Sequence, residues 1–291
     1  MTRRQQTIER PAEIKGFGLF HGYDARVQLL PAQEYHGIVF LRTDLSTPVR
    51  IPAQMEYIVP QLRRTVLSRL GVCVETVEHL LAAFAGLQID NCLVRIDGPE
   101  PPIGDGSSRE IVDALWDAGT TPQSALTNTS EIHESILVTE ESGAALSVSP
   151  TINESLELTY HLDYGTSGLA SQSYTFTYSP KNFVEQIASA RSFVLEQEIN
   201  ALQSQGFGLR ASTRNIVVVG RDGQPIDDKW RWPDECARHK ILDCLGDFLL
   251  AGSIPAGRFI ATRSGHRLNH ALVRRLRGVE RVENRRHARV A

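Results

Sequence analysis

Residues 76–87 read TVEHLLAAFAGL, and residues 238–248 read RHKILDCLGDF. In both stretches apolar residues recur at intervals of three and four, which is the spacing of one face of an α-helix. The second stretch also concentrates histidine, aspartate and lysine beside this apolar face, which is not the even scatter of charge expected on a surface helix, and the first begins with a glutamate and a histidine at its N-terminal rim. A strand pattern and a second helix pattern follow each stretch, at residues 89–97 and 108–119 after the first and at residues 257–264 and 270–278 after the second. The sequence therefore contains two candidate units with the same order of elements.

The segments before the two central helices complete the expected fold. They alternate apolar and polar residues between Gly, Pro and Asp turns, as the strands of an antiparallel meander do. Thr76 is expected to cap the start of the first central helix, and Gly86 its end. The recurrence predicts an α+β fold of two similar domains, each an antiparallel or mixed β-sheet layered with helices, with the helices of the two domains facing each other.

Domain limits follow from the composition of the connecting segments. We expect an N-terminal domain over residues 1–122 and a C-terminal domain over residues 130–280. They are joined by a polar linker, residues 120–129, that is rich in Thr and Ser. Residues 281–291 carry several arginines and are expected to form a solvated basic tail, with contact to a membrane surface as the minority interpretation.

Only the second predicted domain has an inserted segment, at about residues 191–214. Its pattern indicates a helix through Leu202 that is broken at Gly206 and Gly208. The apolar side chains of this segment are either ordinary core or the wall of an apolar ligand groove.

Composition and charge exclude several classes of protein. Apolar residues make up 41% of the 291 residues and charged residues 22%, which is typical of a soluble globular protein. The net charge of −3 provides no global attraction to nucleic acid. No apolar run is long enough to cross a membrane, and residues 1–20 lack the apolar centre of a signal peptide. We expect a cytoplasmic monomer without a transmembrane segment that does not bind nucleic acid.

His239, Asp243 and Asp247 are four residues apart and share one stripe of the second central helix, drifting only about 40° per step. For an isolated His–Asp pair at this spacing, a solvated ion pair is the simpler interpretation. The third acidic residue and the neighbouring Lys240 weaken that interpretation. They favour a polar site built on an apolar helix.

Glu78 and His79 begin the first central helix, where a lone histidine is as often structural as functional. Their interpretation changes when both helices are taken together, because hydrolytic zinc requires three nitrogen or oxygen ligands and an open position. His79, His239 and Asp243 supply that number. Glu78 lies about 100° round the helix from His79, near enough to act as the base that activates the attacking water. The sequence predicts a zinc site between the two domains, and the same ligands also accept iron(II).

An acid is needed for the leaving amine, and two histidines near the C-terminus are candidates. His266 follows Gly265 in a predicted turn, and His270 lies in the predicted helix. We favour His266 because loops present catalytic groups more often than helix bodies do. Asp247 is the residue expected to hold His266 protonated.

Five motifs together resemble a known family, the UDP-3-O-acyl-N-acetylglucosamine deacetylases, which are zinc enzymes of lipid A biosynthesis. They are TVEHLLAAFAGLQIDN at 76–91, PIGDGSS at 102–108, ARSF at 190–193, RHKILDCLGD at 238–247 and SGHRLNHAL at 264–272. The resemblance covers essentially the whole chain. It implies a two-domain fold with the metal between the helices, and hydrolysis of the N-acetyl group of UDP-3-O-(3-hydroxyacyl)-N-acetylglucosamine with release of acetate.

The resemblance assigns further residues by position. It implies that Lys240 binds the substrate near its diphosphate and that Phe193 packs against the sugar. Ser192 stands where the family usually has a threonine that binds the scissile carbonyl, and the inserted segment resembles the family's acyl-chain passage. The resemblance also implies the same roles for the zinc ligands, for Glu78 as base and for His266 as acid.

Three positions depart from the family pattern. Phe20 occupies a place usually held by histidine, Ser68 one often held by cysteine, and Arg210 lies in a turn that is usually richer in glycine. Because these changes concern substrate fit, a zinc amidohydrolase acting on a different N-acyl nucleotide sugar is the alternative. A non-catalytic nucleotide- or RNA-binding protein is the second alternative, and the intact catalytic residues argue against it.

Overall fold

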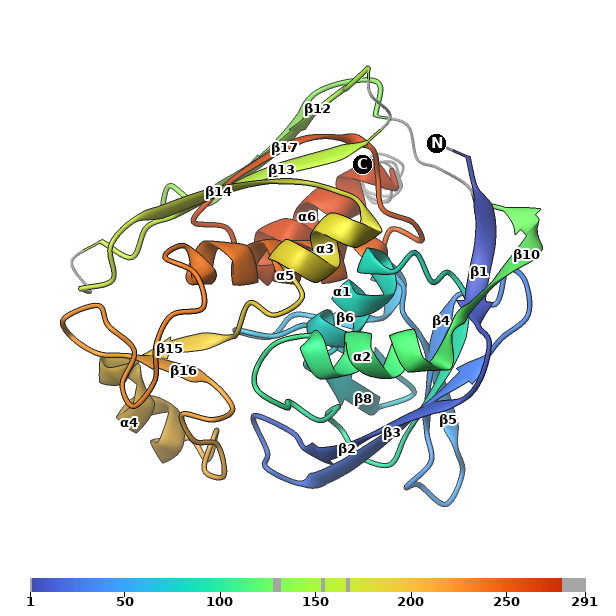
Figure 1. Ribbon diagram of the computed structural model, residues 1–291, viewed down its shortest axis with the longest axis horizontal. Coiled ribbons are helices and arrows are strands. Elements are labelled where there is room, and N and C mark those ends of the chain that lie inside the picture. Colours follow the sequence, from blue (N-terminus) through green and yellow to red (C-terminus); the bar gives the residue numbers. More distant parts are fainter. Residues whose placement is uncertain (1, 128–131, 153–154, 166–167, 279–291) are drawn as a thin grey trace, which may run out of the picture.

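The computed structural model describes residues 2–127, 132–152, 155–165 and 168–278. Two β-sheets form the outer layers and the central helices lie between them (Figure 1). The predicted basic tail, residues 281–291, lies outside the described residues. Within the described part of the chain, no helix is long and apolar enough to cross a membrane.

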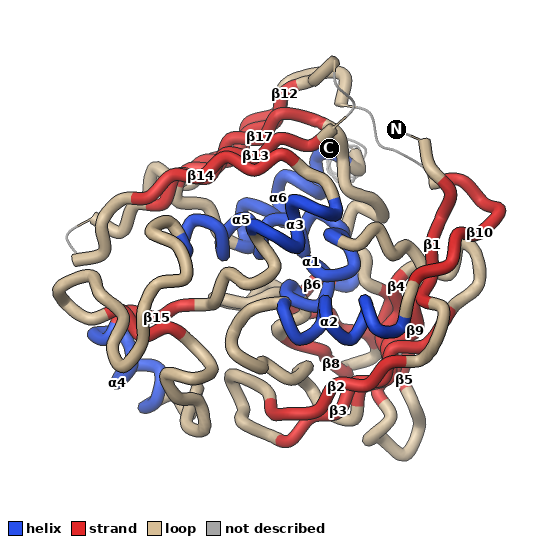
Figure 2. Tube along the Cα trace, in the orientation of Figure 1, coloured by secondary structure: helices blue, strands red, loops and turns tan. Residues whose placement is uncertain are grey.

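The elements of the N-terminal half, in chain order, are β1 (Arg4–Ile8), β2 (Ala12–Phe17), β3 (Asp24–Pro31), β4 (Ile38–Arg42), β5 (Val49–Pro52), η1 (Met55–Tyr57), β6 (Ile58–Val59), β7 (Val66–Arg69), β8 (Val72–Glu75), α1 (Glu78–Gly86), β9 (Cys92–Ile96), α2 (Arg109–Ala118) and β10 (Thr120–Leu126). Those of the C-terminal half are β11 (Ile136–Thr139), β12 (Ala145–Ser149), β13 (Leu156–Leu162), β14 (Gln172–Thr177), α3 (Pro180–Gln186), β15 (Phe193–Leu195), α4 (Glu196–Ser204), β16 (Val217–Val219), α5 (Glu235–Leu249), β17 (Gly257–Thr262) and α6 (His266–Leu276). Figure 2 shows the central helices between the strands of the two large sheets.

The two large sheets have the same topology. Their strand orders are β2-β3-β9-β4-β5 and β11-β12-β17-β13-β14. In each sheet the strand that follows the central helix enters the middle position. It pairs antiparallel with one neighbour (β3 or β12) and parallel with the other (β4 or β13). The α+β fold of two similar units, predicted from the recurring order of elements, is confirmed.

Two local predictions were wrong. The polar stretch after α2 is not all linker, because Thr120–Leu126 form β10, which pairs antiparallel with β1. Thr76 does not cap α1, which begins at Glu78 with Val77 at the cap position. Thr76 instead has a positive φ of 54°, and its hydroxyl donates to Glu100 Oε1 at 2.9 Å. The side chain therefore binds the loop after β9 and not the helix.

The helix of the inserted segment is shorter than the sequence pattern predicts. Residues Phe193–Leu195 form β15, which pairs parallel with β16, and only Glu196–Ser204 are helical. The predicted break follows, with Gly206 and Gly208 both at positive φ. This small two-stranded sheet and α4 form a separate lobe beside the layered core (Figure 1).

Helices α1 and α5 make the central contact between the two halves. Gly246 of α5 packs directly on the backbone of Glu78, the first residue of α1. A Cβ added at Gly246 would lie 2.1 Å from the Glu78 carbonyl oxygen. Gly86, at the other end of α1, is equally constrained, since its Cβ would lie 2.0 Å from the Phe183 ring of α3. Gly246 of α5, against the start of α1, and Gly86, at the end of α1, therefore allow α1 to approach α5 and α3 of the other half.

We expect Gly246→Ala to lower the free energy of unfolding by about 3 kcal/mol, the upper range for overpacking a tight interior. At an unconstrained helix position, the same change would stabilise by about 1 kcal/mol. Urea unfolding measures the difference. Gly98→Ala is the control, because that buried glycine would place its Cβ 3.8 Å from the nearest atom, in ordinary contact. Equal stability of the two variants would contradict the prediction.

Candidate active site

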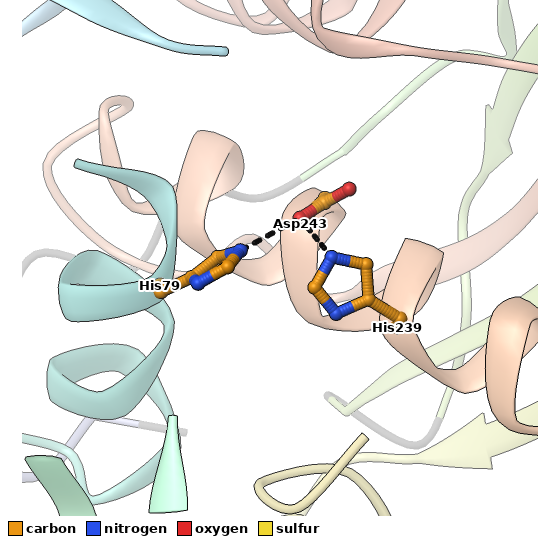
Figure 3. Close-up of side chains that lie close together, drawn as sticks. All are labelled: His79, His239 and Asp243. Atoms are coloured by element: carbon orange, nitrogen blue, oxygen red, sulfur yellow. Dashed lines mark ion pairs between the residues drawn. The ribbon is translucent and has the colours of Figure 1, made fainter. Parts of the chain in front are cut away.

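The three predicted metal ligands meet at the contact of α1 with α5. His79 projects from α1, and His239 and Asp243 project from successive turns of α5 (Figure 3). Asp243 Oδ1 lies 3.4 Å from His239 Nε2 and 3.8 Å from His79 Nε2. The three ligand atoms lie within 4.8 Å of one another, and all three residues are buried. The ligand set predicted from two distant segments is therefore brought together by the fold.

The protonation of these three groups suits a divalent cation. Burial, together with repulsion from His239, lowers the pKa of His79 to about 3. Burial also lowers the pKa of His239, and its Nδ1 lies 3.0 Å from the Ala190 carbonyl oxygen, which directs the Nε2 lone pair toward Asp243. Burial alone would raise the pKa of Asp243, but Lys240 and the histidines hold it well below its usual range. Two neutral imidazoles and one carboxylate form a set that zinc accepts.

Glu78 lies next to this group with one carboxylate oxygen fixed and the other facing the site. Its Oε2 accepts a hydrogen bond of 3.0 Å from the Thr65 amide, and its Oε1 lies 3.7 Å from His266 Nε2. Burial, and repulsion from Asp243 and Asp247, raise the pKa of Glu78 to about 7. A carboxylate with a pKa near neutrality is suited to accept a proton from water.

His266 is held by a buried carboxylate, as predicted. Its Nδ1 donates to Asp247 Oδ2 at 2.8 Å. Burial alone would lower the pKa of His266, but Asp247 and Glu78 raise it to about 9. The imidazole therefore carries a proton that it can donate. One detail differs from the prediction: His266 is the first residue of α6, which begins four residues earlier than its apolar pattern indicates.

His270, the competing candidate for the acid, lies behind His266. Its Nε2 is 3.2 Å from Asp247 Oδ1, and His266 but not His270 is among the residues that line the adjacent cavity. Asn269 also donates to Asp247 Oδ2, at 2.8 Å, and was not singled out from the sequence. The signal was available, because spacings of three and four from His266 put Asn269 and His270 on its face of the helix.

A cavity of about 500 Å³ opens from these groups. Ser192, Phe193 and Lys240 all line it, as do the metal-ligand group, Glu78 and His266. The Lys240 ammonium donates to Asp243 Oδ2 at 2.7 Å and lies 5.8 Å from the centre of the Phe193 ring. Tyr164, which the sequence did not point to, also lines the cavity and makes an edge-to-face contact with Phe193. Every residue predicted to bind substrate thus borders one space.

One part of the cavity wall is apolar and comes from the inserted segment. Its side chains are Ile199, Leu202 and Phe207, with Val218 of β16 and Phe20 of the N-terminal half. Of the two interpretations left open by the sequence, the wall of a groove is observed for Ile199 and Leu202, whereas Leu195 is buried in the core. Phe20 packs edge to face on Phe207, with ring centres 5.5 Å apart. Phe20 therefore adds apolar surface to the wall.

The two other positions singled out from the sequence, Ser68 and Arg210, do not line this cavity. Ser68 is in β7, paired in register with Cys73 of β8. Arg210 is exposed, stacks on the Phe17 ring at 4.3 Å and donates to Asp24 Oδ1 at 2.6 Å. Neither is among the cavity-lining residues. The chemical change at these two positions therefore does not alter the cavity surface directly.

Comparison with known proteins finds the same family that the five sequence motifs resemble. The sequence model of the family described as UDP-3-O-acyl N-acetylglycosamine deacetylase matches residues 5–278. The UDP-3-O-acyl-N-acetylglucosamine deacetylase of Myxococcus xanthus is 38% identical over 272 residues, which cover 94% of this chain and 86% of that protein. Those of Mannheimia succiniciproducens and Nautilia profundicola are 37% and 36% identical, covering 94% and 96% of this chain and 90% and 94% of theirs.

Proposed function

The chain belongs to the UDP-3-O-acyl-N-acetylglucosamine deacetylase family, and on this premise we propose how its buried site carries out the reaction. The activity is hydrolysis of the N-acetyl group of UDP-3-O-(3-hydroxyacyl)-N-acetylglucosamine, with release of acetate, in lipid A biosynthesis. The observation that carries the mechanism is the meeting of two neutral histidines, a carboxylate, a base and an acid at one end of a partly apolar cavity.

His79, His239 and Asp243 would hold the metal, which we propose to be zinc. When bound there, zinc would polarise the scissile carbonyl and make water more acidic. The chain contributes the neutral state of both imidazoles, which burial secures, and the negative charge of Asp243. Iron(II), which accepts the same ligands, is the alternative.

Glu78 and His266 divide the proton transfers between them. Glu78 Oε1 faces the site and accepts a proton from the attacking water. His266, kept protonated by Asp247, donates a proton to the leaving nitrogen, and its positive charge stabilises the negative charge that develops on the carbonyl oxygen. A carboxylate with a raised pKa and an imidazole with a raised pKa are suited to these two opposite tasks.

Three further residues orient the substrate in this proposal. Ser192 binds the scissile carbonyl, Phe193 packs against the sugar ring, and Lys240 stabilises the negative charge on the nucleotide side. The apolar wall of Ile199, Leu202 and Phe207 takes the acyl chain. The proposed substrate thus explains why one cavity combines a polar end with an apolar surface. The cytoplasmic location, the monomeric state and the lack of nucleic-acid binding stay predictions.

Turnover of acylated and non-acylated UDP-N-acetylglucosamine by the purified protein tests this function. We expect kcat/KM to be at least about 1000-fold higher for the acylated compound. Burial of roughly five methylene groups, each worth about 0.8 kcal/mol, accounts for that factor. Acetate release measures both rates. Equal rates for the two compounds would favour the alternative substrate, another N-acyl nucleotide sugar, and no release from either would contradict the proposal.

The pH dependence of kcat tests the acid. Because His266 must be protonated, its pKa of about 9 sets the basic limb of the profile, and activity is lost as the pH rises through that value. Asp247→Asn removes the charge that raises this pKa. We therefore expect the basic limb to move to lower pH by about one unit or more. A basic limb that stays in place in the variant would show that another group controls it.

A further inference from the structure

Thr65 contacts both catalytic groups of the proposed mechanism without lining the cavity. It lies just before β7, in the N-terminal half, and is fully buried. Its backbone amide donates to Glu78 Oε2 at 3.0 Å, and its hydroxyl donates to Asp247 Oδ1 at 2.5 Å. One residue therefore joins the base on α1 to the carboxylate on α5 that holds the acid.

The Thr65 hydroxyl also completes the hydrogen bonding of Asp247. His266 and Asn269 both donate to Oδ2 of this carboxylate, each at 2.8 Å. On the other oxygen, the Thr65 hydroxyl is the closest donor, while His270 Nε2 lies 3.2 Å from Oδ1 and 3.1 Å from Thr65 Oγ1. Because an ionised carboxylate only accepts, the Thr65 hydroxyl donates to Asp247, and its oxygen can accept from His270, while His266 Nδ1 also lies 3.2 Å from it.

The importance of this link follows from where the two catalytic groups originate. Glu78 belongs to the N-terminal half, and His266 and Asp247 belong to the C-terminal half. Their separation depends on how the halves dock, and an error of about 1 Å in such a placement can cost about 100-fold in rate. Among the contacts of the described residues, those of Thr65 connect the Glu78 carboxylate directly with the Asp247 carboxylate.

We propose that Thr65 is a positioning residue that sets the geometry between the base Glu78 and the acid His266 through its hydroxyl bond to Asp247. It does not line the cavity, so it acts through its partners and not on the substrate. This inference rests on the proposed roles of Glu78 and His266. It assigns a function to a residue of the loop before β7, where the sequence shows no motif.

Thr65→Val removes the hydroxyl and keeps the shape of the side chain. We expect kcat to fall by about tenfold to 100-fold, the usual loss when an outer partner of a site residue is removed. KM should stay within about twofold, because the cavity wall is unchanged. Thr65→Ser restores the hydroxyl without the methyl group and should recover most of the lost kcat. If the valine variant turns over at the parental rate, or if the serine variant is as slow as the valine variant, the proposal is wrong.

Thr7→Val is the matched control, because Thr7 is a buried threonine of β1 whose hydroxyl accepts from the Ala32 amide, away from the site. Its kcat should be unchanged. Side-chain ¹⁵N NMR of the histidines supplies a readout independent of activity, with His266→Asn used for assignment. The His266 Nδ1 resonance should move in Thr65→Val and stay in Thr65→Ser and Thr7→Val. An unmoved resonance in Thr65→Val would overturn the positioning role of Thr65, whatever the activity of the protein. Failure of the parental protein to deacetylate the substrate would instead contradict the proposed function.

Discussion

Glu78→Gln is expected to lower kcat by about 100-fold to 10,000-fold, the range attributed to a general base, while the bound metal is retained. The glutamine keeps an oxygen that can accept from the Thr65 amide, so the structure around α1 should persist. It cannot accept a proton from water. Steady-state kinetics with the acylated substrate, and metal analysis of the same preparation, measure the two parts of the expectation.

Glu34→Gln is the control for Glu78→Gln, because Glu34 also accepts backbone hydrogen bonds, from Ser124 and Ala125, but lies outside the cavity. Its kcat should match that of the parental protein. A Glu78→Gln variant with parental kcat would show that Glu78 is not the base. If the variant loses the metal together with its activity, Glu78 is needed to retain the metal.

His239→Ala is expected to weaken metal binding by more than about 100-fold, exceeding the loss when only an outer partner of a ligand is removed. It removes one of three candidate donors, and activity should disappear with the metal. Titration with zinc measures the affinity. His161→Ala is the control, because His161 is exposed on β13 with its Nδ1 bonded to Ser173. If His239→Ala binds metal as tightly as the parental protein does, the proposed ligand set is wrong.

The metal should also stabilise the docking of the two halves, since its candidate ligands come from α1 and α5. A ligand present at 100 times its Kd stabilises the native state by about 2.7 kcal/mol. Chelation should therefore lower the Tm of the parental protein and leave that of His239→Ala almost unchanged. A chelator that changes neither would argue against a bound metal between the helices.

The sequence by itself determined the type and order of the main elements and most of the candidate site. Periodicity identified both central helices, since burial of one helix face imposes a spacing of three and four. The spacing of four placed His239, Asp243 and Asp247 on one face of α5, because that relation is local to a single helix. The recurring order of elements predicted two similar units, and the identical strand orders of the two sheets agree with it.

Only the tertiary structure decided how the distant segments meet. That His79 lies 3.8 Å from Asp243 depends on the close approach of α1 to α5, which Gly246 permits by having no side chain. Thr65 has no periodic or motif signal, since its role comes from contacts with residues 13 and 182 positions away. The pairing of Thr120–Leu126 with β1 likewise depends on a distant partner strand. Local patterns encode helix faces and the order of the elements. The distances between side chains of different elements are set by tertiary packing, which depends on residues from the whole chain and not on any local pattern.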